Sequence, residues 1–474
     1  MSSSDVQTIR ENPAAEEILG GSFRDPSGWV FRHEGAVYRR VNYSYQAAYE
    51  RLMRSGLYEE LVAAGLLVPH AEIDLPGAVC ADAYKVLKPE AIGCVSYPYE
   101  WCFSQLKAAA QATLAIQRAA LGHGMTLKDA SAYNIQFRRG RPVLIDTLSF
   151  EPDTDSAWVA YRQFVQHFLA PLALMRYGDV RLGQLSRVCL DGVPLDLASR
   201  LLPLRTRWRW SLLLHVHLHA GSQRRYADVR LAAQLRQQRL SRAAREGLLD
   251  SLAAAVERLR LPDDRTTWSD YATAHHYAEE TYARKMQVVE AMLREAAPAV
   301  VWDLGANTGI FSRIASRLGA SVVAFEMDHA CVETNYRAVV QGGEENILPL
   351  ILDLANPSPA LGWGHAERMS LAQRGPADTV LALALVHHLA LSNNVPFDRL
   401  AAYFAGLGRS LIIEFVPKQD PMAQKLLQNR DDVFPGYTRD AFERAFQRYF
   451  AIRQVTPLPA SERVLYLLER CHAA

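Results

Sequence analysis

The C-terminal part of the chain alternates short apolar runs with helical segments, and this pattern constrains the fold more than any other feature. From about residue 266 onward the apolar runs are AVVWDL, SVVAFE, ILPLIL, TVLALALV and SLIIEF. Short runs that are apolar throughout are typical of strands buried on both faces. The helical segments between most of them predict a parallel sheet covered by helices on both sides. The segments YFAIRQVTPL and RVLYLLER predict two further strands.

A glycine turn follows the first apolar run and narrows the class of ligand. The turn reads DLGANTG, begins at Asp303 and contains Gly305 and Gly309. It lacks the middle glycine of a dinucleotide-binding GxGxxG turn and the lysine of a phosphate-binding GxxxxGK[ST] loop. A carboxylate at the end of a strand repels a phosphate and suits an ammonium group. We therefore expect a ligand that carries an amine and no phosphate here.

The next two strands also end in acidic residues. Glu326 follows the second strand, where a carboxylate accepts hydrogen bonds from ribose hydroxyls, and Asp353 follows the third, where it can meet an adenine amino group. A ligand with an amine, a ribose and an adenine but no phosphate is S-adenosylmethionine (SAM). The glycine turn would let the backbone approach the amino-acid and ribose portions closely.

The motifs DLGANTG, VVAFEMD, LILDLA, ALALVHHL and LIIEFVP resemble, in this order, those of class I SAM-dependent methyltransferases. The resemblance implies an α/β, Rossmann-like domain with a seven-stranded sheet over residues 266–474, and SAM as its cofactor. The cofactor-binding residues that it implies are Asp303, Gly305, Asn307, Gly309, Glu326, Asp353, Leu354 and Lys285. The stretches WSDYA, LVHHLALSNNVP, IIEFVPKQDPM and DVFPGYT are similar to a bacterial, nodulation-associated methyltransferase family, and this similarity covers nearly the whole chain.

The same resemblance places the methyl acceptor over the ends of the fourth and fifth strands. The candidate catalytic residues there are His387, His388 and Glu414. A neutral histidine can remove a proton from an oxygen or nitrogen nucleophile. We favour His388 as the residue that faces the site, with His387 packed under the sheet, although both can be structural. Glu414 either binds a substrate amine, orients a histidine, or forms an ordinary ion pair.

Candidate substrate-binding residues surround these positions. They are Tyr277, Asn393, Asn394 and Lys418. By resemblance, Tyr277 and Lys285 contact the cofactor carboxylate or the substrate, and the alternative is an aromatic patch that seals the domain. The sequence lacks the [ND]PP[YF] motif of methyltransferases that act on exocyclic amines, and it lacks the paired cysteines used for pyrimidine carbon. These absences argue against nucleobase and glutamine acceptors.

Residues 21–190 resemble the kinase-like α+β fold of the aminoglycoside phosphotransferases. The resemblance is carried by LKDASAYNIQFRRGRPVLIDTLSF, in which Asp129, Asn134 and Asp146 follow the kinase order. In kinases the first aspartate orients the acceptor hydroxyl, and the asparagine and second aspartate hold magnesium. In this chain the three residues form at most a vestigial kinase site, or they fix a loop.

This N-terminal region departs from the kinase pattern at several points. It has no glycine-rich loop, and Arg39 and Arg40 stand near the position of the usual strand lysine. Asp146 is followed by Thr-Leu rather than Phe-Gly. We therefore expect a pseudokinase that presents a substrate or a partner, with a bifunctional kinase/methyltransferase as the alternative.

The remaining segments predict a flexible tail over residues 1–20 and a helical, arginine-rich connector over 191–265. In the connector, arginines accompany Trp208 and Trp210, a pattern that suits nucleic acid, an anionic membrane surface, a solvated face or an inter-domain contact. Its alternating histidines would spread around a helix and could not converge on a metal. The scattered cysteines have no metal-ligand spacing, so we expect no metal.

Length, charge and hydropathy exclude several classes of protein. The chain has 474 residues and a net charge of +1, which predicts two or three domains and argues against a nucleic-acid binder held by overall charge. Without a membrane-spanning run or a signal-peptide core, we expect a cytoplasmic protein that does not insert into membranes. The expected activity is methyl transfer to an oxygen or nitrogen of a small molecule. RNA or protein acceptors, and a cofactor sensor without turnover, are the alternatives, and the oligomeric state is open.

Overall fold

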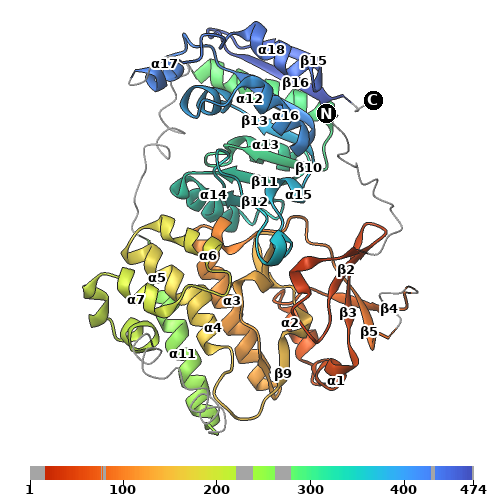
Figure 1. Ribbon diagram of the computed structural model, residues 1–474, viewed down its shortest axis with the longest axis vertical. Coiled ribbons are helices and arrows are strands. Elements are labelled where there is room, and N and C mark those ends of the chain that lie inside the picture. Colours follow the sequence, from red (N-terminus) through yellow and green to blue (C-terminus); the bar gives the residue numbers. More distant parts are fainter. Residues whose placement is uncertain are drawn as a thin grey trace, which may run out of the picture.

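The computed structural model describes residues 17–75, 77, 82–219, 239–261, 279–428 and 433–471. The chain forms two bodies, with the N-terminal half below and the C-terminal half above in the view of Figure 1. Among the described helices, none is both long enough and apolar enough to cross a membrane. Tyr277, a candidate substrate-binding residue, lies outside the described residues.

The C-terminal body is built on a sheet of seven strands. The strands are β10 (Val300–Leu304), β11 (Ser321–Glu326), β12 (Ile347–Ile351), β13 (Ala377–Ala382), β14 (Gly408–Phe415), β15 (Phe450–Pro457) and β16 (Val464–Arg470). Their order in the sheet is β12-β11-β10-β13-β14-β16-β15. The first five pair in parallel, and β16 runs antiparallel between β14 and β15. The parallel α/β arrangement predicted by the apolar runs is confirmed.

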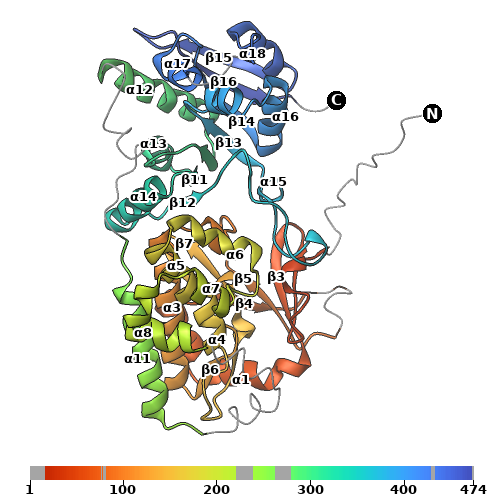
Figure 2. The ribbon, with the colours of Figure 1, turned by 60° about the vertical axis from the view of Figure 1, so that its left-hand side comes forward.

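Helices cover both faces of this sheet. They are α12 (Glu279–Ala296), α13 (Ile310–Arg317), α14 (His329–Gly342), α16 (Phe397–Leu407), α17 (Pro421–Leu427) and α18 (Arg439–Gln447). In β14, Ile412 belongs to a core shared with α12 and α13, whereas Leu411 and Ile413 belong to a core shared with α16 and α18. Figure 2 shows α12 and α13 on one side of the sheet and α16 on the other. Side chains on both faces are therefore buried, which explains why the strands read as continuous apolar runs.

The N-terminal body begins with a five-stranded antiparallel sheet in the order β1-β2-β3-β5-β4. Its strands are β1 (Glu17–Ile18), β2 (Val30–His33), β3 (Ala36–Val41), β4 (His70–Ile73) and β5 (Lys85–Pro89). The strands β2 and β3 pair antiparallel as a hairpin. The flexible tail expected over residues 1–20 is wrong at its end, because Glu17 and Ile18 pair with Arg32 and Phe31. Two residues at a sheet edge carry too little pattern to predict such pairing.

A helical lobe lies beside this sheet. Its helices include α1 (Gln46–Arg54), α2 (Leu57–Ala63), α3 (Phe103–Gly122), α5 (Ala170–Tyr177), α7 (Leu195–Leu201), α8 (Trp210–Leu212) and α11 (Arg242–Arg258). It also contains two short hairpin-like pairs, β6 (Met125–Leu127) with β9 (Phe150–Pro152) and β7 (Ile135–Arg138) with β8 (Arg141–Leu144). The helix α11, expected in the connector, packs along α3, where Arg118 is 2.6 Å from Asp250.

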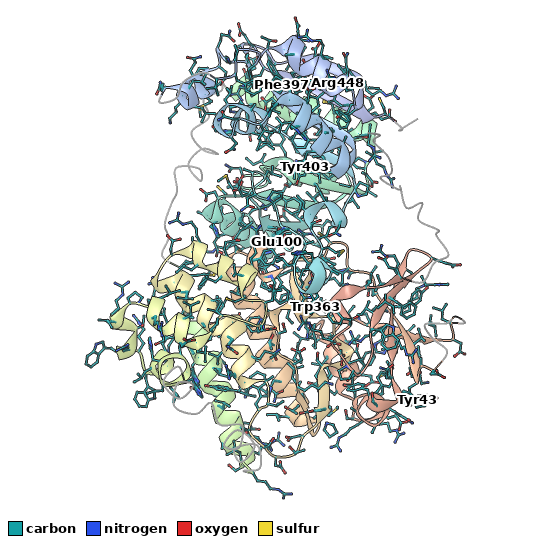
Figure 3. All side chains as sticks on the ribbon, viewed as in Figure 1. Tyr43, Glu100, Trp363, Phe397, Tyr403 and Arg448 are labelled. Carbon is teal, nitrogen blue, oxygen red and sulfur yellow. The ribbon has the colours of Figure 1, made fainter. Side chains whose placement is uncertain are left out.

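Buried polar contacts join the two bodies. Arg374 of the upper body lies 2.5 Å from Glu100 of the lower body, and both side chains are at most 2% exposed. Ser104, at the start of α3, donates hydrogen bonds from its amide and its hydroxyl to Glu333 of α14. Figure 3 labels Glu100 at this junction. A charge pair with no access to water can be broken only at a large cost in free energy, so the junction is specific.

Candidate active site

The glycine turn lies between β10 and α13, and its glycines have different roles. Both Gly305 (φ 78°) and Gly309 (φ 83°) adopt the left-handed conformation that favours glycine. Gly305 is exposed, and an added Cβ would meet only the Leu385 side chain, at 3.4 Å. At the buried Gly309, a Cβ would lie 2.5 Å from the Asn335 amide. Gly309 is thus needed for packing, whereas Gly305 leaves backbone open for the approach of a ligand.

Asp303 ends β10 beneath this turn as a buried carboxylate. Its side chain is only 2% exposed, and the Ser312 hydroxyl of α13 donates a 2.6 Å hydrogen bond to Oδ2. Burial raises the pKa of Asp303 to about 6, with the nearby carboxylate of Glu326 acting in the same direction. A positively charged group beside Asp303 would relieve this penalty on the ionised form.

Glu326 holds the glycine turn against the end of β11. Its Oε2 accepts a 3.0 Å hydrogen bond from the Asn307 amide, and its Oε1 accepts from the amides of Met327 and Asp328 at 2.7 and 2.9 Å. Burial raises the pKa of Glu326, although these backbone donors oppose the shift. Asn307 itself has a φ of 50°, so the turn is held in a left-handed conformation at a residue other than glycine.

The acidic residue that follows β12 differs from Asp303 and Glu326 because its side chain is exposed. Asp353 is exposed, and its Oδ1 accepts a 2.8 Å hydrogen bond from the Ala355 amide in its own turn. The neighbouring Leu354 is half-buried. The Leu352 amide donates to the Glu326 carbonyl at 2.9 Å, so the ends of β11 and β12 are adjacent. The predicted cofactor residues at the ends of β10, β11 and β12 therefore share one edge of the sheet.

A buried ionic cluster lies at the end of β14. Glu414 is fully buried, and its Oε2 accepts hydrogen bonds from Lys285 Nζ at 2.6 Å and from the Ala384 amide at 2.7 Å. Arg463 Nη1 lies 3.5 Å from Glu414 Oε1. The same guanidinium also binds Asp420 through two hydrogen bonds, of 2.6 and 2.9 Å. Two residues predicted for separate roles, Lys285 and Glu414, thus form an ion pair.

The charges of this cluster stabilise one another. Burial alone would raise the pKa of Glu414, but the positive charges of Lys285 and Arg463 outweigh burial and lower the pKa. Burial lowers the pKa of Lys285, and Glu414 opposes that shift. The arrangement keeps Glu414 ionised inside the domain.

The two histidines follow β13, and their rings are 4.2 Å apart. His387 is 1% exposed, and neither of its ring nitrogens has a hydrogen-bond partner among the described residues. Burial lowers its pKa well below the ordinary value, with His388, Arg463 and Lys285 adding to the effect. His388 is half-buried, and burial lowers its pKa as well. Both imidazoles are therefore neutral near pH 7.

Three predicted substrate-binding residues make local contacts. Asn393 is exposed, and its amide donates a 3.2 Å hydrogen bond to the His388 carbonyl, which ends the π-helical turn His388–Ser392. Asn394 is also exposed and has a φ of 55°. Lys418 Nζ donates a 2.5 Å hydrogen bond to the Phe434 carbonyl.

Sequence reasoning missed Arg463, Asp420 and Ser312. Arg463 precedes β16 and is 3% exposed, but an arginine before an apolar strand usually lies in solvent. Asp420 also caps α17, where it accepts a 2.9 Å hydrogen bond from the Met422 amide. The Asp-Pro pair at the start of α17 is a recognisable capping signal, whereas the burial of Arg463 has none.

The N-terminal body brings together the three kinase-type residues. Asp129 Oδ1 accepts hydrogen bonds from the Ser131 amide at 2.9 Å and from Gln163 Nε2 at 2.7 Å, and burial together with the negative charge of Asp146 raises the pKa of Asp129. Arg39 of β3 lies 2.8 Å from Asp146 and 2.9 Å from Asp25. The guanidinium therefore neutralises the negative charges of Asp146 and Asp25.

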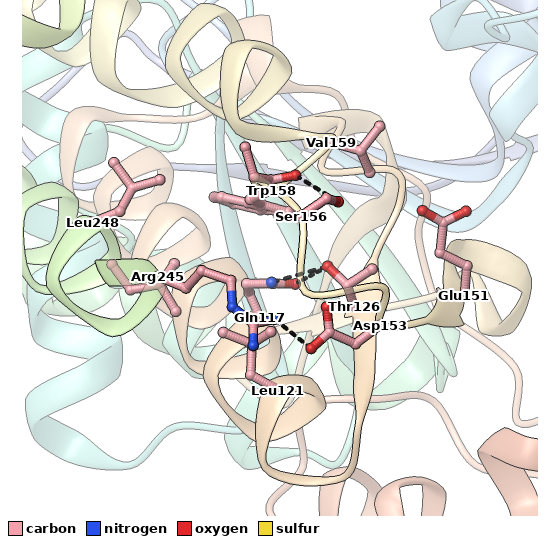
Figure 4. Close-up of a pocket in the computed structure, with 12 residues that line it drawn as sticks. Gln117, Leu121, Thr126, Glu151, Asp153, Ser156, Trp158, Val159, Arg245 and Leu248 are labelled. Atoms are coloured by element: carbon pink, nitrogen blue, oxygen red, sulfur yellow. Dashed lines mark hydrogen bonds and ion pairs between the residues drawn. The ribbon is translucent and has the colours of Figure 1, made fainter. Parts of the chain in front are cut away.

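Two other features of the N-terminal body are structural. His215 contacts the hydroxyls of Tyr161 and Ser251 at 2.8 Å each, so this histidine is engaged by side chains rather than directed at an open space. Figure 4 shows a pocket of about 20 Å³ near α3 and α11, large enough for roughly one water. Arg245 and Asp153 line it and form an ion pair, and Arg245 also pairs with Asp155. None of these residues belongs to the glycine-turn site.

Comparison with known proteins places the chain in a family. It is 36% identical to nodulation protein NoeA of Rhizobium meliloti (strain 1021) over 462 residues, which is 95% of this chain and 96% of that protein. No protein-family model matches the chain.

Similar solved structures cover less than half of the chain. One is magnesium protoporphyrin IX methyltransferase (ChlM) from Synechocystis PCC 6803 with bound SAH, at 20% identity, 40% of this chain, 84% of that chain and a TM-score of 0.29. Another is the bifunctional kinase-methyltransferase WbdD, at 14% identity, 42% of this chain, 41% of that chain and a TM-score of 0.29. Because 95% of the chain aligns with nodulation protein NoeA at 36% identity, the chain belongs to the family of that protein.

Proposed function

We propose that this protein is a SAM-dependent methyltransferase that transfers a methyl group to an oxygen or nitrogen of a small-molecule acceptor. The observation that carries the proposal is the edge formed by buried Asp303, exposed Gly305 and Glu326. It offers carboxylates and open backbone at adjacent strand ends, and it offers no phosphate-binding lysine. These groups match a ligand that carries an amine and a ribose.

The residues fit the cofactor in charge and shape. When bound, SAM supplies an electrophilic methyl group on a positively charged sulfur. Asp303 would pair with the amino group of the ligand, because burial raises the pKa of this carboxyl and a cation favours its ionised form. Glu326 would accept hydrogen bonds from the ribose hydroxyls, and Asp353 with Leu354 would border the adenine. Because Gly305 has no side chain, the ligand would have room to contact the protein backbone there.

His387 is the strongest candidate for the residue that removes a proton from the acceptor. A buried polar group without a partner costs about 1–3 kcal/mol, so an orphaned imidazole is retained where a ligand completes its hydrogen bonds. Its neutral form can accept a proton from an O–H or N–H nucleophile. His388, favoured from the sequence, lies beside it with its ring tilted by 42° and is the alternative base. Glu414, paired with Lys285 and Arg463, acts in this proposal as an anchor beneath the histidines.

The acceptor is proposed to be small because the described part of the site is enclosed. The His387 side chain is 1% exposed and the Glu414 side chain is fully buried. A side chain on a folded protein or a base within an RNA helix would need more of the surrounding elements to move before it reached these buried groups than a small molecule would.

Calorimetric titration with SAM and with S-adenosylhomocysteine tests the cofactor site. We expect wild type to bind both and Asp303→Asn to lose at least about tenfold in affinity, because a buried charge-assisted contact is removed. Asp378→Asn is the matched control. Asp378 lies at the start of β13, at the edge of the sheet opposite to the glycine turn, and accepts hydrogen bonds from the Ala299 and Val300 amides. Absence of binding to wild type, or equal losses in both variants, would contradict the proposal.

For the N-terminal body we propose a kinase-like binding domain without phosphotransfer. The support is the Arg39 guanidinium, which is already bound to Asp146 and Asp25. Titration with Mg-ATP should give no heat of binding. ATP hydrolysis that is lost in both Asp129→Asn and Asp146→Asn would instead establish the bifunctional alternative.

A further inference from the structure

The segment between α7 and the π-helical turn Leu213–Leu218 exposes an unusual set of side chains. Trp208 is 91% exposed and Trp210 is 75% exposed. Exposed leucines and arginines precede and follow them in the sequence, from the end of α7 to the π-helical turn. The basic aromatic patch is Arg200, Leu201, Leu204, Arg205, Arg207, Trp208, Arg209, Trp210, Leu214 and Leu218. Large exposed apolar side chains gathered in one segment indicate an interaction surface.

The patch is built on a rigid base. Leu202, Thr206 and Leu212 of the same segment are buried, so the exposed residues alternate with anchored ones. His217 lies 2.8 Å from the Ser199 hydroxyl of α7 and 2.9 Å from the Thr206 hydroxyl. His217 therefore connects the π-helical turn to α7 and to Thr206. The tryptophans are thus presented by a packed scaffold and are not simply the ends of a loose loop.

The charge of the patch is positive and uncompensated. From Leu197 to His219 the sequence contains four arginines and no aspartate or glutamate, although the whole chain carries a net charge of only +1. The four arginines form no ion pair with any described residue. Arg205 and Arg209 instead contact Tyr177, through a 3.5 Å hydrogen bond and a ring contact. An anionic partner would therefore meet a surface whose cations are available.

We infer that the basic aromatic patch binds the surface of an anionic lipid membrane. Arginine favours the headgroup region, and tryptophan and leucine partition into the boundary between headgroups and acyl chains. Four exposed leucines would have no role in stacking on nucleic acid bases, which argues against RNA. A second copy of the chain would bring like charges together. The inference is independent of the methyl-transfer proposal, because the patch lies on the lower body while the glycine turn lies on the upper one (Figure 1).

Vesicle co-sedimentation of the full-length protein tests this inference. We expect binding to vesicles of equal parts phosphatidylcholine and phosphatidylglycerol, weakened by salt, and no binding to phosphatidylcholine alone. Trp208→Ser combined with Trp210→Ser, and separately Arg205→Glu combined with Arg207→Glu, should each reduce the bound fraction by more than about tenfold. The matched control is Trp363→Ser, since Trp363 is likewise 75% exposed but lies outside the patch, at the junction of the two bodies in Figure 3.

The outcomes separate the possible partners. Tryptophan emission that shifts to shorter wavelength on anionic vesicles, and that is lost in the Trp208/Trp210 variant, supports insertion at the interface. The inference is overturned if wild type ignores anionic vesicles or if Trp363→Ser loses as much binding as the patch variants. Patch-dependent binding to an RNA oligonucleotide, or patch-dependent self-association, in the absence of vesicle binding also overturns it. Thermal unfolding of each variant identifies any loss that comes from misfolding.

Discussion

At the scale of single residues, Asp303 combines a structural cost with the proposed role in binding. Its carboxyl is buried, and the pKa is raised from the ordinary value of 3.8 to about 6. The folded protein therefore binds more protons than the unfolded chain between these two pKa values. Stability from this group is fully present below about pH 4 and is lost as the pH rises through about 6.

Replacing Asp303 should accordingly stabilise the protein without ligand. Asp303→Asn keeps an acceptor for the Ser312 hydroxyl and removes the ionisation penalty, which is at most about 3 kcal/mol above pH 7. Urea denaturation at pH 5 and pH 8 should show a gain at pH 8 and a smaller one at pH 5. The control Asp378→Asn should show no such gain, and a variant that is less stable than wild type at pH 8 would contradict the expectation.

The lowered pKa values of His387 and His388 predict an unusual pH profile for the catalytic rate. Because burial lowers the pKa of both His387 and His388, the catalytic rate at saturating cofactor should not fall as pH drops through 6.5. The KM for SAM should rise below about pH 6, where Asp303 becomes protonated.

His387→Gln should lower kcat by about 10²–10⁴-fold with little change in cofactor affinity, and His388→Gln should lower it less. The reverse ranking would assign the base to His388.

At the scale of elements, the glycine turn separates packing from ligand access. Gly309→Ala places a Cβ 2.5 Å from the Asn335 amide in a left-handed conformation, so it should lower the free energy of unfolding by about 2 kcal/mol or more. Gly305→Ala meets only Leu385 and should lower it by about 1 kcal/mol. Denaturation and SAM titration of both variants check this. We expect Gly305→Ala to lose affinity beyond what its loss of stability explains.

The end of β14 shows how an element positions charge. Glu414 is held in a fully buried position by the strand, and α12 and the start of β16 supply Lys285 and Arg463. Removing one member leaves an uncompensated charge, whereas an isosteric change that keeps the hydrogen bonds is milder. This arrangement also keeps the segment that carries the histidines attached to β14, because the Ala384 amide donates to Glu414.

At the scale of the whole molecule, the buried pair of Glu100 and Arg374 couples the two bodies. Arg374→Met leaves Glu100 buried without its partner and should destabilise the protein by about 3–5 kcal/mol. Scanning calorimetry should then show the upper and lower bodies unfolding in separate transitions. The pair of exposed Arg439 and half-buried Glu443 is the matched control, and Arg439→Met should change stability by less than about 1 kcal/mol. A single unshifted transition in Arg374→Met would contradict this coupling.

Much of the fold could be predicted because it follows from patterns of apolar and polar residues that are close together in the sequence. The apolar runs of β10, β11 and β14 are signals that a few neighbouring residues carry. The glycine turn and the acidic strand ends belong to the same category, since each lies within a few residues of a strand. Glu17 and Ile18 show the limit, because two residues at a sheet edge have no period from which pairing can be inferred.

The composition of the site, by contrast, was decided by tertiary structure. Lys285 and Glu414 are 129 residues apart along the chain, and Arg463 is 49 residues beyond Glu414. No local pattern states that three such residues share one buried cluster, because parallel strands and their helices bring distant segments together only when the sheet forms. The sequence by itself therefore determined the parallel α/β sheet and the residues at its strand ends. Tertiary packing decided which charges are buried together, that the His387 ring nitrogens meet no hydrogen-bond partner within the described part of the chain, and that the two bodies are joined by a buried ion pair.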